Sequence, residues 1–210
     1  IFHGGKIIYE KCAKKKNLLF TLASKFYQLE KRGFDEVLIC VYSEQLSGFR
    51  EITIQLLHET FGKGGKGFSA IFAVGPEVQH HTVQRFFGGR KNMSAIFISV
   101  KNHVKDKIKV PKKLWDVKIR EIKIKKLDEI YYDYALWCEF EALRKTTERR
   151  GYPYIVLEIE KIDEKCVGAL LAFWQMFAYY SAVIRGVNPF DQPDVEEMKT
   201  YTVKLLAKKL

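Results

Sequence analysis

Four short apolar runs, each separated from the next by segments of helical pattern, constrain the fold of this chain more than any other feature. The runs are rich in β-branched residues and span 36–42, 69–74, 95–100 and 154–159. Strands that are apolar on both faces lie in sheets that helices cover on both sides. We therefore predict an α/β fold, a three-layer α/β/α sandwich around a mainly parallel sheet.

Between these runs, apolar residues recur at helical spacing. Residues 1–210, of which 47% are hydrophobic, suffice for one sizeable core, and we predict a single domain. The longest apolar run, 167–180, contains Gln175 and is interpreted as a buried helix, so we expect no membrane partner. The predicted helices are 18–30, 43–60, 80–87, 127–150, 164–185 and a final one at about 194–209 that packs as a C-terminal extension.

The net charge of +11 is concentrated between residues 101 and 126. Within this segment, 117–124 alternates apolar and charged residues, which predicts a half-buried strand at a sheet edge with one solvated face. The segment lacks the interleaved aromatic residues that stack nucleic-acid bases. We predict no nucleic-acid partner; a duplex-binding protein would instead show strongly salt-dependent binding.

The cysteines and the glycine-rich stretch argue against several familiar sites. Four scattered cysteines without a C-x-x-C pair indicate neither a zinc site nor a disulfide framework, and the expected compartment is the reducing cytoplasm. His80 and His81 are adjacent, but no third metal ligand follows at a useful spacing. The stretch 62–67 lacks the spacing of a nucleotide phosphate loop and is interpreted as a flexible crossing between a helix and a strand.

Three polar residues lie where chemistry could occur. His80 follows a strand end, and an imidazole can transfer protons near neutral pH. Glu59 ends a helix just before the glycines. Lys199 lies near the start of the last helix, where the helix dipole disfavours a cation and a lysine can be directed at an anion. Taken singly, each is more often a solvated or capping residue.

Three segments, in order along the chain, resemble the glucose-6-phosphate isomerase family. Residues 190–199, FDQPDVEEMK, are similar to the family's F-D-Q-x-x-V-E-x-x-K signature. Residues 55–63, QLLHETFGK, resemble its Q-x-x-x-E-[ST]-x-G-K segment. Residues 75–80, GPEVQH, look like its loop ending in Q-H, and the short interval before that loop resembles the bacterial branch. Three ordered motifs are far more specific than any one of them.

The resemblance implies an enzyme that interconverts glucose 6-phosphate and fructose 6-phosphate without a metal or an organic cofactor. It implies that Glu59 moves a proton between C1 and C2 through a cis-enediol. His80 would assist ring opening from the neighbouring subunit of a homodimer, and Lys199 would act near the ring oxygen. Gln55 and Gln192 would hydrogen-bond the substrate or its phosphate.

The sequence also departs from the family's pattern. His81 replaces a residue that is often small, and Met198 stands where glycine is common. The family's first domain supplies a Ser/Thr loop for the phosphate and an arginine for the enediolate, and neither motif is found here. We therefore expect a C-terminal half that lacks its N-terminal domain and is inactive alone. The alternative is a non-catalytic, sugar-phosphate-binding regulatory module, which has no need of Glu59 and Lys199 together.

Overall fold

The computed structural model describes residues 1–101 and 106–208. These residues cluster in two compact units. Unit 1 comprises Ile1–Val37, Phe49–Ile71 and the chain from Glu164 onward, and unit 2 comprises Leu38–Gly48 and Phe72–Asp163. The predicted end of the last helix at 209 lies outside the described residues.

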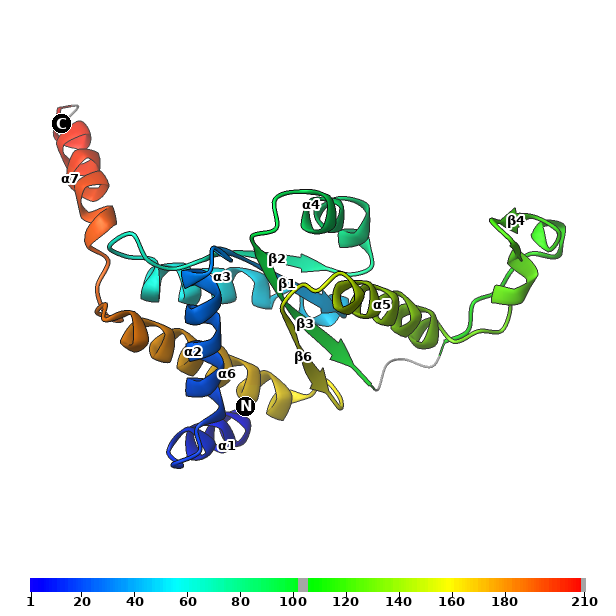
Figure 1. Cartoon of the computed structure of the whole chain (residues 1–210), viewed down its shortest axis with the longest axis horizontal. Coiled ribbons are helices and arrows are strands. Elements are labelled where there is room, and N and C mark those ends of the chain that lie inside the picture. The colour runs from blue at the N-terminus through cyan, green and yellow to red at the C-terminus, as the bar shows by residue number, and fades with distance from the viewer. Residues whose placement is uncertain (102–105, 209–210) are drawn as a thin grey trace. The chain divides into compact units, whose positions relative to one another are not determined.

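A four-stranded sheet joins the four predicted apolar runs in the order β2-β1-β3-β6. Every residue of β3 is buried, and β3 pairs in parallel with β6 from Ala95 to Val100. Helices flank this mostly parallel sheet, which confirms the predicted fold class (Figure 1). The strands are β1 (Glu36–Tyr42), β2 (Ser69–Val74), β3 (Met93–Val100) and β6 (Tyr154–Ile159).

Unit 2 positions the predicted histidine on a short turn that follows β2. This 3-10 turn, η2 (Glu77–His80), leads into helix α4 (Thr82–Gly88). Helix α5 (Tyr132–Arg149) packs on β3, and its Phe140 ring meets the Tyr42 ring with centroids 5.4 Å apart. This buried aromatic contact thus packs α5 against β1.

The predicted helix from 127 begins later than expected, because a 3-10 turn, η4 (Ile124–Leu127), precedes it. Glu129 then adopts a φ of 65°, a left-handed conformation that interrupts a right-handed helix.

Unit 1 is built around helix α6 (Glu164–Arg185), against which three other helices pack. Its Trp174 and Phe177 side chains are at most 1% exposed. α6 is long and apolar enough to cross a membrane by composition. Its contacts are those of a core helix, because its sides are covered by α1 (Phe2–Cys12), α2 (Leu18–Lys31) and α3 (Phe49–Phe61).

Helix α1 was not predicted, and glycines explain its close packing. A Cβ atom at Gly4 would lie 1.8 Å from the carbonyl oxygen of Lys165, and one at Gly168 would lie 1.8 Å from that of Ile1. The two backbones approach so closely only because both positions lack a side chain.

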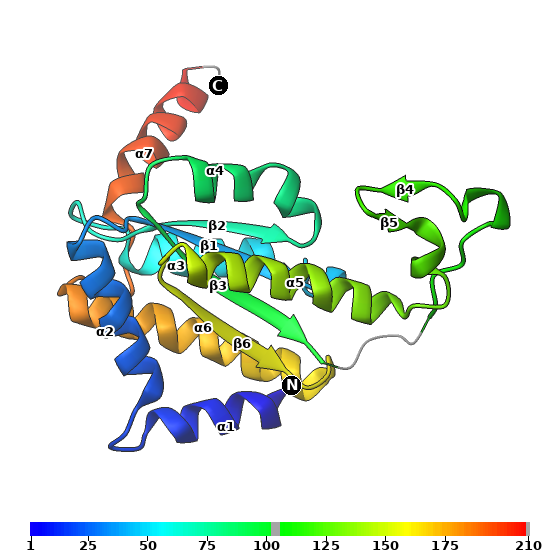
Figure 2. The same cartoon turned by 45° about the vertical axis from the view of Figure 1, so that its right-hand side comes forward.

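Helix α7 (Pro193–Ala207) begins close to the predicted position, with Pro193 in its first turn. Within its described length every residue is exposed, and Figure 2 shows it extending away from α6. The packing of this helix as an extension therefore stays a prediction.

The predicted edge strand at 117–124 is wrong. This segment folds back on itself as an exposed antiparallel hairpin of β4 (Lys118–Ile119) and β5 (Ile122–Lys123), outside the four-stranded sheet. Arg120 adopts a φ of 53° and makes the turn. The alternation of apolar and charged residues therefore belongs to a two-stranded ribbon, in which Ile119 and Ile122 pair and both remain more than half exposed.

Candidate functional site

Helix α3 carries Gln55 and Glu59 on one face. Its buried positions are Thr53, Leu57 and Phe61, which recur every four residues and fix the rotation of the helix in unit 1. Gln55 and Glu59 are also four residues apart, so their side chains are neighbours. The Gln55 amide donates a hydrogen bond of 3.0 Å to one carboxylate oxygen of Glu59.

A second amide reaches the same carboxylate from the far end of the chain. Gln192 occupies the N-cap position of α7, and its side-chain amide donates to the other carboxylate oxygen of Glu59. The Glu59 carboxylate is therefore held between two amides, and one lone pair on each oxygen stays available for a further proton or ligand. The structure thus brings Gln55, Glu59 and Gln192 together.

A cavity of about 550 Å³ opens beside this cluster. Gln55 and Glu59 are among its polar lining residues, while Tyr179 and Phe190 contribute aromatic rings whose centroids are 6.3 Å apart. The cavity combines an apolar surface with a few convergent polar groups, which is typical of small-molecule sites.

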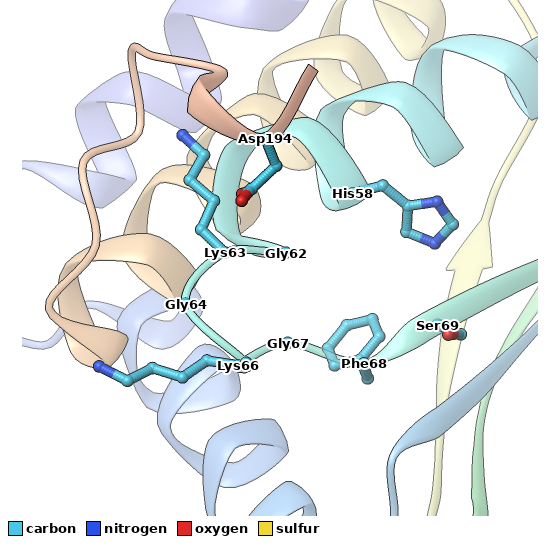
Figure 3. Close-up of a pocket in the computed structure, with 10 residues that line it drawn as sticks. His58, Gly62, Lys63, Gly64, Lys66, Gly67, Phe68, Ser69 and Asp194 are labelled. Atoms are coloured by element: carbon cyan, nitrogen blue, oxygen red, sulfur yellow. The ribbon is translucent and has the colours of Figure 1, made fainter. Parts of the chain in front are cut away.

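The glycine-rich loop crosses from α3 to β2, as the sequence predicts, and several hydrogen bonds anchor it. Figure 3 shows the Lys63 and Lys66 side chains directed away from the loop. The Lys66 ammonium donates to the carbonyl oxygen of Arg185 at 2.7 Å, at the end of α6. The backbone N–H of Gly67 donates to the Glu30 carboxylate at 2.9 Å. Because both ends of these bonds lie in unit 1, the loop is fixed to the helices around it.

Lys63 is the residue of this region that sequence reasoning missed. Its side chain is only 8% exposed, and its ammonium contacts the carbonyl oxygens of Asn188 and Asp191 and, at 2.8 Å, the Asp191 carboxylate. The Lys63 ammonium holds the pKa of the Asp191 carboxyl below its usual range. The available signal was the lysine that closes the Q-x-x-x-E-[ST]-x-G-K segment.

A smaller cavity of about 430 Å³ lies over the same loop and includes His58, Gly62 and Asp194 (Figure 3). The His58 Nε2 accepts a hydrogen bond of 2.9 Å from the backbone N–H of Ala70, at the start of β2. Partial burial lowers the pKa of His58, because desolvation disfavours the charged imidazolium. His58 thus supports the strand as a neutral ring.

His80 and Lys199 are exposed residues, each described within its own unit. His80 is exposed on η2 in unit 2, where Gln79 anchors the turn by donating to the Tyr42 hydroxyl at 2.9 Å. Lys199 is exposed on α7 and donates to Glu196 at 2.6 Å. Within the described residues, the polar contact of the Lys199 ammonium is with Glu196 and not with Glu59. The roles of His80 and Lys199 therefore stay predictions.

No protein-family model matches the sequence. Relatives do match it: the glucose-6-phosphate isomerase of Acholeplasma laidlawii is 31% identical over 93% of this chain and 45% of its own length. That of Mycoplasmopsis pulmonis is 32% identical over 93% of this chain and 46% of its own length. A crystal structure of a glucose-6-phosphate isomerase from Chlamydia trachomatis superposes with a TM-score of 0.74 at 17% identity, covering 99% of this chain and 42% of that one.

The mostly parallel sheet and this superposition define an α/β sandwich fold that the chain shares with a solved glucose-6-phosphate isomerase. Its carboxylate lies beside a cavity, held by two amides. The sequence matches make the chain a homologue of the glucose-6-phosphate isomerase family, as its three motifs predicted. It spans about half the length of the curated relatives that it matches.

Proposed function

We propose that this chain is the C-terminal half of a glucose-6-phosphate isomerase and that Glu59 is the base of the reaction. The observation that carries the proposal is the Glu59 carboxylate, held between the amides of Gln55 and Gln192 at the edge of a cavity. A carboxylate in this setting can take a proton from one face of a sugar phosphate and return it to the neighbouring carbon. Both amides can release the carboxylate and donate to substrate oxygens.

The remaining groups of the proposed reaction come from the neighbouring subunit, from α7 and from an N-terminal half. His80 assists ring opening from the neighbouring subunit of a homodimer, and Lys199 acts near the ring oxygen. An N-terminal half supplies the phosphate-binding loop and the arginine that stabilises the enediolate. The reaction uses no metal or organic cofactor, and the protein works in the cytoplasm. Support comes from the relatives, each of which is named glucose-6-phosphate isomerase and is about twice as long as this chain.

The test replaces Glu59 by Gln in the full-length protein that carries this chain. Glutamine keeps the shape and loses the ability to accept a proton. Turnover of fructose 6-phosphate is expected to fall by about 10²- to 10⁴-fold, the range of a general base. Binding of fructose 6-phosphate, measured by calorimetric titration, should change far less, because the neighbouring amides remain.

The outcomes separate the proposal from its alternative. A wild-type protein that binds sugar phosphates without converting them would be the regulatory module. Undiminished turnover in Glu59→Gln would refute the role of Glu59. Measurable isomerase activity of the 210-residue chain alone would refute the requirement for a second half.

A further inference from the structure

The amide of Gln192 meets Glu59 only if the segment between α6 and α7 follows one path. This segment is exposed from Asn188 to Gln192 apart from a half-buried Pro189, so apolar burial does little to fix it. Local turns order it in part: Asn188 accepts from the Phe190 backbone N–H at 3.1 Å and donates to the Asp191 carboxylate at 2.9 Å. Neither bond ties the segment to α3, where Glu59 lies.

Lys63 supplies that tie. It follows the last residues of α3, four positions after Glu59, and its ammonium is buried against the inner side of the segment. It donates to the carbonyl oxygens of Asn188 and Asp191 and to the Asp191 carboxylate, which uses all three of its donors on one short stretch of chain. The residue after Asp191 is Gln192.

We propose that Lys63 is a positioning residue that clamps segment 188–191 onto the end of α3 and thereby directs the Gln192 amide to Glu59. This inference rests on the proposed function for its catalytic consequence, although the clamp itself is a structural claim. A buried ammonium with three oxygen acceptors is costly to leave half-paired, so the clamp has one favoured arrangement. Lys63 acts through Gln192 and does not touch the reacting atoms.

The first experiment measures the clamp without any substrate. Lys63→Met in the full-length protein keeps most of the aliphatic stem and removes all three donors. Hydrogen–deuterium exchange of the peptides that cover 186–193 should become faster, while exchange of the sheet peptides stays unchanged. Lys66→Met is the matched control, because Lys66 binds the end of α6 and not segment 188–191. Unchanged exchange at 186–193 in Lys63→Met would overturn the clamp.

The second experiment asks whether Lys63 acts through Gln192. Lys63→Met should lower kcat/KM about 10- to 100-fold, the equivalent of one hydrogen bond to a charged group. In a Gln192→Ala background the same substitution should lower it less than about threefold, because the group that it positions is already gone. Equal losses in both backgrounds would assign Lys63 a merely structural role.

A milder variant covers the case in which Lys63→Met fails to fold. Asp191→Asn leaves the two carbonyl contacts of Lys63 and removes the ion pair, together with one of the two oxygens that accept from Lys63 and Asn188. It should therefore give a smaller increase in exchange and a smaller loss of kcat/KM than Lys63→Met. Wild-type exchange in Asp191→Asn, together with wild-type kcat/KM, would contradict the clamp. Absence of isomerase activity in the wild-type protein would refute the proposed function instead, and the exchange experiment would still decide on the clamp.

Discussion

Loss of Glu30 should strongly destabilise this chain, because it leaves a fully buried arginine without its counter-charge. The Arg185 side chain is 0% exposed and that of Glu30 is 13% exposed. The Arg185 Nε donates to the Glu30 carboxylate at 2.9 Å, and Nη2 donates to the same oxygen. In Glu30→Ala, the hydrogen bond left to the guanidinium within the described part of the chain is the one to the carbonyl of Ser181, at 2.9 Å.

The size of the destabilisation in Glu30→Ala follows from these contacts. Breaking a buried ion pair by removing one partner costs about 3–5 kcal/mol. The guanidinium also lies over the rings of Phe61, Phe68 and Tyr27, with centroid distances of 4.6, 5.7 and 5.3 Å. These rings offset part of the loss of the carboxylate, since each cation–π contact is worth about 0.5–2 kcal/mol. We therefore expect Glu30→Ala to lower the free energy of unfolding by about 3 kcal/mol, near the lower end of the range for a broken buried ion pair. The total free energy of unfolding of a protein is about 5–15 kcal/mol.

Urea unfolding followed by circular dichroism measures this loss. Glu30→Ala should lower the free energy of unfolding by about 3 kcal/mol, and the double variant Glu30→Ala/Arg185→Met should lose less, because no buried charge remains. Glu10→Ala is the control, since the Lys6–Glu10 pair is largely exposed and should contribute at most about 1 kcal/mol. A loss below about 1 kcal/mol in Glu30→Ala, or fully additive effects in the double variant, would refute the reasoning.

Two further predictions concern pH and helix packing. Folding lowers the pKa of His58, so the unfolded chain binds this proton at a higher pH than the folded chain does. His58 should therefore leave the free energy of unfolding unchanged above about pH 6.5 and should lower it as the pH drops through that value. Urea midpoints of wild type and His58→Gln at pH 7.5 and 5.5 check this, and an equal acid dependence in both would contradict it. Gly4→Ala should destabilise by about 1–3 kcal/mol because its Cβ meets the Lys165 carbonyl, whereas Gly5→Ala, with 3.5 Å of space, should stabilise α1 by about 0.5–1 kcal/mol. Thermal melts of the two variants measure the difference, and equal melting temperatures would rule out the close helix contact.

The strands could be predicted because their signal is local. The runs at 36–42 and 69–74 coincide with β1 and β2, since only strands covered on both faces remain apolar throughout. The alternation at 117–124 was equally clear but misleading, because a pattern of period two does not distinguish a sheet edge from an isolated ribbon. The deciding feature was the left-handed Arg120, and sequence gives little warning of a non-glycine residue in that conformation.

Only part of the candidate site could be predicted from the sequence. The motifs named Gln55, Glu59 and Gln192, but no local pattern indicates that two amides would flank one carboxylate across 133 positions. Lys63 was missed because a lysine beside glycines is usually solvated, and its burial depends on acceptors 125 and 128 positions away. Long-range contacts of this kind follow from the fold and not from residue spacing.

The most direct test of the central claim follows the proton itself. Fructose 6-phosphate is incubated with the full-length protein in deuterium oxide, and deuterium at C1 is measured by NMR. If Glu59 moves the proton on one face of the sugar, one of the two C1 hydrogens should exchange, and Glu59→Gln should slow this exchange at least about 100-fold. Exchange at the wild-type rate in Glu59→Gln, or exchange of both C1 hydrogens, would contradict the account.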